Sequence, residues 1–95
     1  MGYKLVWDDF ASNNLDKLDS SVRKQILKFL DKLDKRDDPR TLGEALEENL
    51  AGYWKYRVGN YRIIAEIQDD KLIIILIAIG HRDKIYRITD KRLNK

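Results

Sequence analysis

The chain has 95 residues, of which 43% are hydrophobic and 37% are charged, a length and balance typical of one folded domain. It contains no cysteine and one histidine, His81, which excludes disulfides and thiolate metal sites and leaves no ligand set for a zinc or iron centre. The formal net charge is +3, and the sequence shows no signal peptide and no apolar run long enough to span a bilayer. We therefore expect a single cytoplasmic domain over residues 1–95, with no metal, cofactor or membrane partner.

The charge is unevenly spread along the chain. Residues 1–52 carry nine basic and eleven acidic side chains, whereas residues 53–95 carry ten basic and five acidic ones. This asymmetry favours a polyanion as the partner of the C-terminal half. A basic chain can also be merely soluble, so charge alone leaves nucleic-acid binding open.

The first part of the chain predicts a strand followed by two helices. Residues 3–7 are rich in aromatic and β-branched types, which favours a strand. Asp8 is a candidate cap for a first helix, whose apolar residues recur at helical spacing as Ala11, Leu15 and Leu18. Ser20 is a candidate cap for a second helix, which Pro39 brings to an end. Its apolar stripe is formed by Val22, Ile26, Phe29, Leu30 and Leu33.

The second predicted helix also has a basic side. Beside the apolar stripe, basic residues recur at helical spacing as Lys24, Lys28, Lys32 and Lys35, and they are interleaved with Asp31 and Asp34. A mixed charged side of this kind is most often simply solvated. With a polyanionic partner, it would be a surface for docking on RNA.

After an irregular, partly acidic stretch over residues 40–52, the sequence predicts a three-stranded antiparallel meander. Gly59-Asn60 separates residues 53–58 from 61–68 and is typical of a two-residue hairpin turn. A second turn is expected at Asp69-Asp70, before a strand from Lys71 to Ile79 that is apolar on both faces and should lie inside the sheet. The two helices would cover one face of this sheet, and residues 82–95 form a short basic tail. The fold class is therefore α+β.

The first predicted hairpin brings cations together. A two-residue turn places Arg57 opposite Arg62 and Lys55 opposite Ile64, so Lys55, Arg57 and Arg62 share one face. Two arginines directly opposite each other repel, and an anion bound between them would relieve the repulsion. Alternatively, these side chains extend into solvent or pair with Glu47, Glu48 or Glu66.

The second predicted turn extends this pairing to the third strand. A turn at Asp69-Asp70 places Ala65 opposite Ile74, Ile63 opposite Leu76 and Tyr61 opposite Ala78, all on the helix-covered face. Beyond this strand, Gly80 permits a bend that would return Arg82 and Tyr86 over the cleft that holds Arg62. Arginine suits phosphate and tyrosine offers a stacking surface, although Tyr86 is equally suited to holding the tail down as a hydrophobic plug.

The hairpin and the residues after the third strand resemble a known family. The run Asn-Leu-Ala-Gly-Tyr-Trp-Lys-Tyr-Arg-Val-Gly-Asn-Tyr-Arg-Ile-Ile, followed by Ile-Gly-His-Arg-Asp-Lys-Ile-Tyr, closely resembles the RelE/ParE toxin superfamily, and the likeness extends from Tyr3 to about Arg87. The resemblance implies the RelE fold and, in the RelE-type branch, a toxin of a type II toxin–antitoxin system. Such a toxin cleaves mRNA in the ribosomal decoding site by attack of the 2′-hydroxyl, which leaves a 2′,3′-cyclic phosphate and needs no metal. Its implied partners are mRNA, the ribosome with its 16S rRNA, and a cognate antitoxin in a hetero-oligomer.

The resemblance also implies roles for individual residues. Lys55 matches a catalytic lysine that acts as general base or charge stabiliser, and Arg62 matches the arginine that stabilises the transition state. Arg82 matches the arginine on the leaving-group side, and Tyr86 the aromatic that stacks on a substrate base. Tyr53 departs from the pattern because the best-known branch has a second lysine there. This leaves the general base open, and Arg57 or His81 could share that role.

Further RNA contacts are expected from Arg57 and His81, although a surface turn position is the simpler interpretation of His81. The basic helix side formed by Lys24, Lys28 and Lys32 is expected to dock on ribosomal RNA. Two other functions stay possible: a ParE-like poison of DNA gyrase, which cuts nothing itself, and a non-catalytic RNA-binding module. The joint presence of Lys55, Arg62, Arg82 and Tyr86 favours the ribonuclease.

Overall fold

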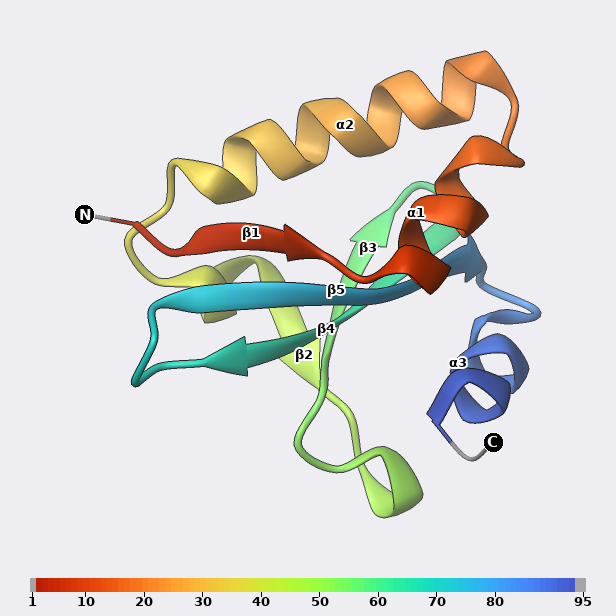
Figure 1. Ribbon diagram of the computed structural model, residues 1–95. Helices are drawn as coiled ribbons and strands as arrows, with labels where there is room; N and C mark the ends of the chain where they lie inside the picture. Colours follow the sequence, from red (N-terminus) through yellow and green to blue (C-terminus); the bar gives the residue numbers. More distant parts are fainter. Residues whose placement is uncertain (1, 94–95) are drawn as a thin grey trace.

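The computed structural model describes residues 2–93 (Figure 1). Its elements follow in the order β1 (Lys4–Trp7), α1 (Asp9–Asp16), α2 (Ser20–Asp34), the short 3-10 helix η1 (Pro39–Leu42), β2 (Gly43–Ala45), a second 3-10 helix η2 (Glu48–Leu50), β3 (Trp54–Val58), β4 (Tyr61–Gln68), β5 (Ile73–His81) and α3 (Ile85–Leu93). The strands form one sheet in the order β1-β5-β4-β3-β2, in which β1 is parallel to β5 and the other neighbours are antiparallel. The predicted α+β architecture is confirmed, and two short edge strands extend the meander on either side.

The N-terminal strand and helices lie where the sequence predicts them. Asp8 caps α1, because its carboxylate accepts a hydrogen bond from the backbone N–H of Phe10 at 3.1 Å. The cap of α2 is Asp19 rather than the predicted Ser20, since the Asp19 carbonyl already accepts a helical hydrogen bond from Arg23. No helix within residues 2–93 is long and apolar enough to cross a membrane.

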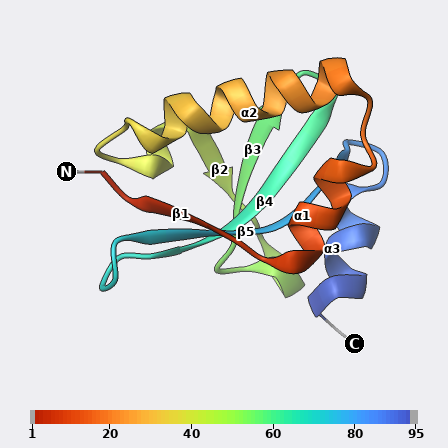
Figure 2. The same cartoon turned by 45° about the horizontal axis from the view of Figure 1, so that its top comes forward.

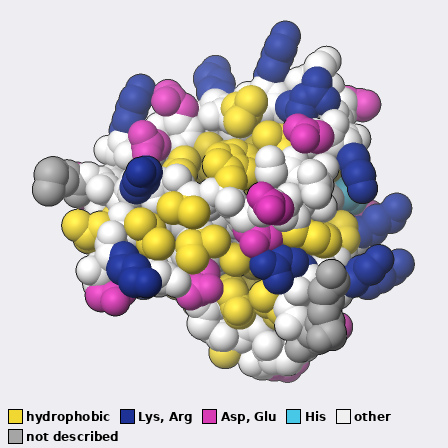
Figure 3. Space-filling view, viewed as in Figure 1, with side chains coloured by type: hydrophobic (Ala, Val, Ile, Leu, Met, Phe, Trp, Pro, Cys, Tyr) yellow, Lys and Arg dark blue, Asp and Glu magenta, His cyan; other side chains and the backbone are white. Residues whose placement is uncertain are grey.

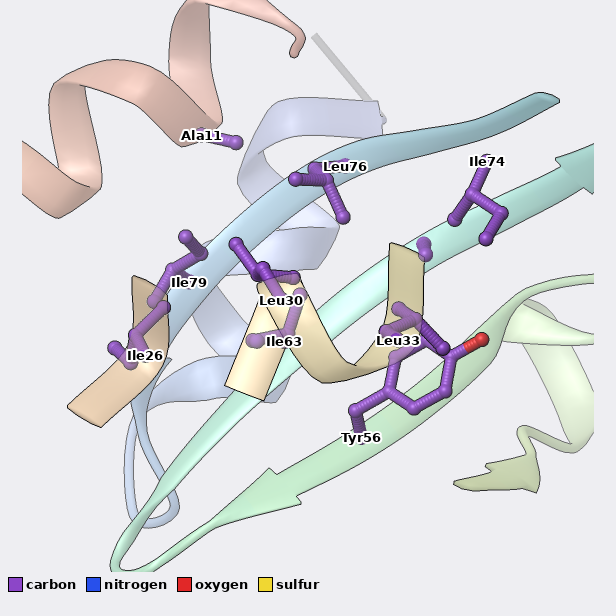
Figure 4. Packing of buried hydrophobic residues seen from close by; sticks show 10 residues of the cluster. Ala11, Ile26, Leu30, Leu33, Tyr56, Ile63, Ile74, Leu76 and Ile79 are labelled. Atoms are coloured by element: carbon purple, nitrogen blue, oxygen red, sulfur yellow. The ribbon is translucent and has the colours of Figure 1, made fainter. Parts of the chain in front are cut away.

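The helices α1 and α2 cover one face of the sheet, while α3 lies at the other face (Figure 2). Figure 4 shows the first core, where Ile26, Leu30 and Leu33 of α2 project onto the strands. Tyr56 of β3 is completely buried among them, and its hydroxyl donates a 2.8 Å hydrogen bond to the carbonyl of Pro39. Burial raises the pKa of the Tyr56 hydroxyl well above its ordinary value, so it stays a neutral donor.

A second core lies between the other face of the sheet and α3. Ile64 and Ala78 of the sheet pack there with Ile85 of α3, and all three are completely buried. Gly80 allows this approach, since a Cβ atom at that position would lie 2.8 Å from Cδ1 of Ile88. The apolar part of this face is therefore covered by α3, whereas the sequence suggested an open apolar floor beside the cations.

The predicted register of the second hairpin is wrong. The connection is longer than the expected Asp69-Asp70 turn, because β4 ends at Gln68 and β5 begins at Ile73. Ala65 therefore lies opposite Leu76 instead of Ile74. A bulge between Ile64 and Ala65 shifts the pairing again, so that Ile63 lies opposite Ile79 and Tyr61 opposite His81. Ala78 consequently faces the second core and not the helices.

The stretch over residues 40–52 is more ordered than its composition indicates. It contains β2, whose three residues pair with β3 so that Gly43 lies opposite Tyr56 and Glu44 opposite Lys55. A Cβ atom at Gly43 would lie 2.4 Å from the carbonyl oxygen of Lys55, so only glycine permits this close approach. A strand of three residues has no readable alternation, which explains why the sequence does not predict it.

Candidate active site

The first hairpin has the predicted register. Arg57 lies opposite Arg62 and Lys55 opposite Ile64, with Gly59 at a φ of 58° in the turn. Because side chains alternate along a strand and Tyr56 faces α2, the three cations share the face of the sheet that is turned away from α1 and α2. The structure therefore confirms the shared face of Lys55, Arg57 and Arg62.

Lys55 is partly enclosed, with a side chain that is 22% exposed. Its Nζ donates a hydrogen bond to the hydroxyl of Tyr86 at 3.2 Å and lies 5.9 Å from the centre of the tyrosine ring. On its other side, Oε1 of Glu44 lies 3.8 Å away. An ammonium, a phenol and a carboxylate thus meet at one point on the surface.

Arg62 binds the turn beside it. Its Nη1 donates to the carbonyl oxygens of Gly59 and Tyr61 at 2.9 and 2.8 Å. This arrangement directs the guanidinium along the hairpin, while Arg57 opposite is exposed. The repulsion between the two arginines is therefore partly relieved by backbone carbonyls, and their pairing alone does not require a bound anion.

Arg82 lies beside the tip of the same hairpin. Its backbone N–H donates to the carbonyl of Asn60 at 2.8 Å, which ties the end of β5 to the turn that carries Arg62. The Arg82 side chain is 58% exposed, with Nε 3.8 Å from the carboxylate of Asp83. The contact with Asn60 thus places the backbone of Arg82 at the tip of the hairpin that carries Arg62.

Tyr86 lies in the first turn of α3 and is 45% exposed. Its hydroxyl contacts Lys55, whereas the sequence placed it over Arg62. Such exposure does not suit a hydrophobic plug, and the neighbouring residue Ile85 has that role because it is completely buried. The Tyr86 ring is therefore available for stacking next to the lysine.

Four predicted RNA-binding residues lie away from Lys55 and Tyr86. The bulge in β5 turns His81 to the helix-covered side, where its ring meets that of Tyr61 edge to face at 5.4 Å. The Nδ1 atom of His81 accepts a hydrogen bond from the backbone of Asp83. The other three are Lys24, Lys28 and Lys32, which are exposed on the outer side of α2, where Figure 3 shows a row of basic side chains at the top of the molecule.

Two hollows open beside Lys55, and its side chain contributes to the walls of both. The larger, about 600 Å³, lies between the η2 segment and α3 and includes Tyr86 in its wall. The smaller, about 280 Å³, lies between the segment from η1 to β2 and strand β3 and includes Arg57. Four carboxylates at these hollows were not predicted as part of a site: Glu44 in the smaller, and Glu47, Glu48 and Asp90 in the larger.

Glu44 has no signal in the sequence, because only its pairing across β2 brings it to Lys55. The sequence did single out Glu47 and Glu48, but as partners for the arginines. Within residues 2–93, no group of three or more acidic or histidine side chains is arranged to hold a metal ion.

Comparisons with known proteins show which family this chain resembles. Residues 5–86 match the family described as the ParE toxin of the type II toxin–antitoxin system parDE. The chain is 30% identical over 96 residues to the mRNA interferase toxin RelE of Escherichia coli K12, covering 98% of this chain and 99% of that protein. It is 29% identical over 87 residues to the toxin RelG of Mycobacterium tuberculosis, covering 92% and 99%.

Solved structures show the same fold. The RelBE2 toxin–antitoxin complex of M. tuberculosis matches with a TM-score of 0.78 at 25% identity, covering 86% of this chain and 100% of the matched chain. A double mutant of E. coli RelE in the free state matches with a TM-score of 0.71 at 27% identity, covering 98% and 99%.

Proposed function

We infer an mRNA-cleaving activity from one premise: the chain belongs to the RelE/ParE superfamily of toxins from type II toxin–antitoxin systems. The similar E. coli protein is named an mRNA interferase. This chain is proposed to be a ribosome-dependent endoribonuclease that stops translation and is restrained by a cognate antitoxin. The observation that carries the proposal is the contact of Lys55 with Tyr86 at 3.2 Å on the cationic face of the sheet.

The proposed reaction needs positive charge, a proton acceptor and a proton donor. The 2′-hydroxyl oxygen attacks the adjacent phosphorus, a P–O bond forms as the bond to the 5′-oxygen breaks, and a 2′,3′-cyclic phosphate results. Arg62 and Arg82 would stabilise the charge that develops on the phosphoryl oxygens and the leaving group, while Tyr86 would hold a neighbouring base by stacking. Each of these groups acts without a metal ion.

The contact between Glu44 and Lys55 supports a division of the proton transfers. At neutral pH a carboxylate is ready to accept a proton and an ammonium is ready to donate one. Glu44 would then take the proton of the 2′-hydroxyl, and Lys55 would supply one to the departing 5′-oxygen. The alternative, in which Lys55 is itself the base, leaves Glu44 only to orient the lysine.

Substitution of Glu44 by glutamine separates these two roles. If Glu44 is the base, Glu44→Gln should slow single-turnover cleavage by about 100-fold or more, the usual contribution of a general base. Glu66→Gln is the matched control, because Glu66 lies on the same face of the sheet but does not contact Lys55. A Glu44→Gln rate within a factor of two of wild type would assign the base to Lys55.

The partners proposed for this chain are mRNA, 16S rRNA in the ribosome and an antitoxin, with which it would form a hetero-oligomer in the cytoplasm. The similar RelBE2 structure is itself a toxin–antitoxin complex, which supports the last partner. Cleavage is tested with one message, with and without ribosomes, by identifying the product ends. Ribosome-dependent cuts with 2′,3′-cyclic ends support the proposal. DNA breaks and arrested DNA synthesis after induction, with translation intact, would support a gyrase poison instead.

A further inference from the structure

Lys55 stands between two hollows, and a phosphodiester likewise stands between two nucleosides. We propose that the larger hollow binds the nucleoside on one side of the cleaved phosphate, the smaller hollow binds the nucleoside on the other side, and Glu47 and Glu48 select the base in the larger one. This proposal rests on the proposed ribonuclease function and adds the sequence preference of the same site. Its geometric basis is that the Lys55 side chain belongs to the walls of both hollows.

The larger hollow suits a purine base. Its volume of about 600 Å³ is within the range of cavities that enclose small ligands. One wall is the exposed ring of Tyr86, a stacking surface for the extended face of a purine, and Leu46 and Leu50 add apolar lining. The exposed tyrosine ring at this wall therefore favours a stacked base over a sugar or a phosphate.

The carboxylates of the larger hollow decide which edge of the base is bound. Glu47 and Glu48 line it, and neither carboxylate has a hydrogen bond or ion pair within residues 2–93. Together with Asp90 they outnumber the two cations of this lining, Lys55 and Arg87, so we place the phosphate at Lys55 and the uncharged base beyond it. Because a carboxylate only accepts hydrogen bonds, it selects a purine with N–H donors on its Watson–Crick edge. Guanine presents two such donors side by side.

The smaller hollow differs in both size and charge. At about 280 Å³ it has less than half the volume of the larger one, which favours a single-ring base. Arg57 lines it and is exposed, so its guanidinium can bind the next phosphate along the strand. The two sides of the cleaved bond should therefore have different preferences: a donor-bearing purine on one side and a pyrimidine on the other.

Base analogues test the role of the two carboxylates. Ribosomes carry messages that differ only in the nucleotide at the larger hollow, with guanine, hypoxanthine or adenine, and single-turnover cleavage is measured. Hypoxanthine lacks the 2-amino group of guanine, and loss of one hydrogen bond to a charged acceptor should slow the wild-type protein about tenfold. The Glu47→Gln/Glu48→Gln double variant should cut guanine and hypoxanthine messages at rates within about threefold of each other. Glu66→Gln, which lies outside both hollows, should keep the wild-type preference.

An uncleavable dinucleotide separates this proposal from the proposed function. A purine–pyrimidine dinucleotide without the attacking 2′-hydroxyl is titrated into the isotope-labelled protein, and the backbone N–H signals are followed by NMR. Shifts at both Leu46–Leu50 and Thr41–Glu44 support two subsites even if the wild-type protein cleaves no RNA. Shifts at only one hollow, or equal base preference in the wild type and the double variant, would overturn the proposal.

Discussion

The carboxylate of Asp8 joins the first and last helices of the fold. It accepts hydrogen bonds from Nε and Nη2 of Arg92 at 2.9 and 2.6 Å while it also caps α1. The hydrogen bonds from Arg92 hold the pKa of Asp8 below its usual range, and the same contact raises the pKa of Arg92. Because α3 carries Tyr86, this ion pair stabilises the position of the helix that supplies the aromatic ring of the candidate site.

Removal of Arg92 should lower stability in a pH-dependent way. A carboxyl whose pKa is lower in the folded state stabilises the fold above its unfolded value, here 3.8, and this contribution disappears as pH falls through the folded value. Arg92→Ala should therefore cost about 1 kcal/mol at pH 7, since both side chains keep some contact with water. As the pH falls through the folded pKa of Asp8, the difference in stability from wild type should shrink toward zero. Urea unfolding at several pH values measures this, with Lys91→Ala on the same helix as the control.

Substitution of Arg62 and Arg82 should abolish toxicity without unfolding the protein. Arg82→Ala removes an exposed side chain whose structural link is through the backbone, so its melting temperature should equal that of wild type. Arg62→Ala also loses two hydrogen bonds to the hairpin turn and should cost about 1 kcal/mol. Growth after induction and thermal melting check both effects. A soluble, folded double variant that still arrests growth would contradict the proposed site.

The sequence predicts strand pairing correctly where the residues of a turn fix the register of the strands on either side. Gly59-Asn60 permits one short hairpin, so the pairing of Arg57 with Arg62 and the shared face of Lys55 could be predicted. The second connection has no such constraint. Its two extra residues shift the register by two, and the bulge at Ile64 shifts it by one more. The last shift turns Ala78 away from the helix-covered face of the sheet and His81 toward it.

Glu44 shows a second limit of sequence analysis. Its position depends on the three-residue strand β2, which pairs with β3. So short a strand shows no alternation of apolar and polar residues from which it could be predicted. The contact between Tyr86 and Lys55 depends in turn on how α3 packs against Gly80. Residues brought together by packing between distant segments were thus the ones that local patterns did not predict in full.

Two glycine substitutions should separate steric crowding from backbone strain. At Gly43 a methyl group would lie 2.4 Å from the carbonyl of Lys55 and 2.6 Å from Nε1 of Trp54, so Gly43→Ala should displace β2 and cost about 1–3 kcal/mol. It should also reduce cleavage, because Glu44 moves with the strand. At Gly52 the space is open but φ is 98°, so Gly52→Ala should cost about 1 kcal/mol through the backbone alone and leave Lys55 in place. Denaturant titration and cleavage assays compare the two.

The basic side of α2 should matter only for cleavage on the ribosome. Lys24, Lys28 and Lys32 lie on the outer side of the helical layer, whereas Lys55 and Tyr86 lie on the opposite face of the sheet. One short single strand cannot contact both surfaces, but a folded RNA that surrounds the protein can. Replacing the three lysines with glutamine should therefore weaken ribosome binding, while the slow cleavage of naked RNA stays at the wild-type rate.

The salt dependence of binding gives this prediction a quantitative test. Each lost phosphate contact should reduce the slope of log affinity against log salt by about 0.7–0.9, so loss of three contacts should reduce it by about 2–3. The control replaces Lys4, Lys17 and Lys71, which are also exposed but lie outside α2, and so changes the net charge equally. If both triple variants lose affinity to the same extent, net charge alone attracts the toxin to the ribosome and α2 is not a specific docking surface. If only the α2 variant loses affinity and its cleavage of naked RNA is unchanged, the two faces of the sheet have separate roles: α2 holds the protein on ribosomal RNA and the opposite face cuts the message.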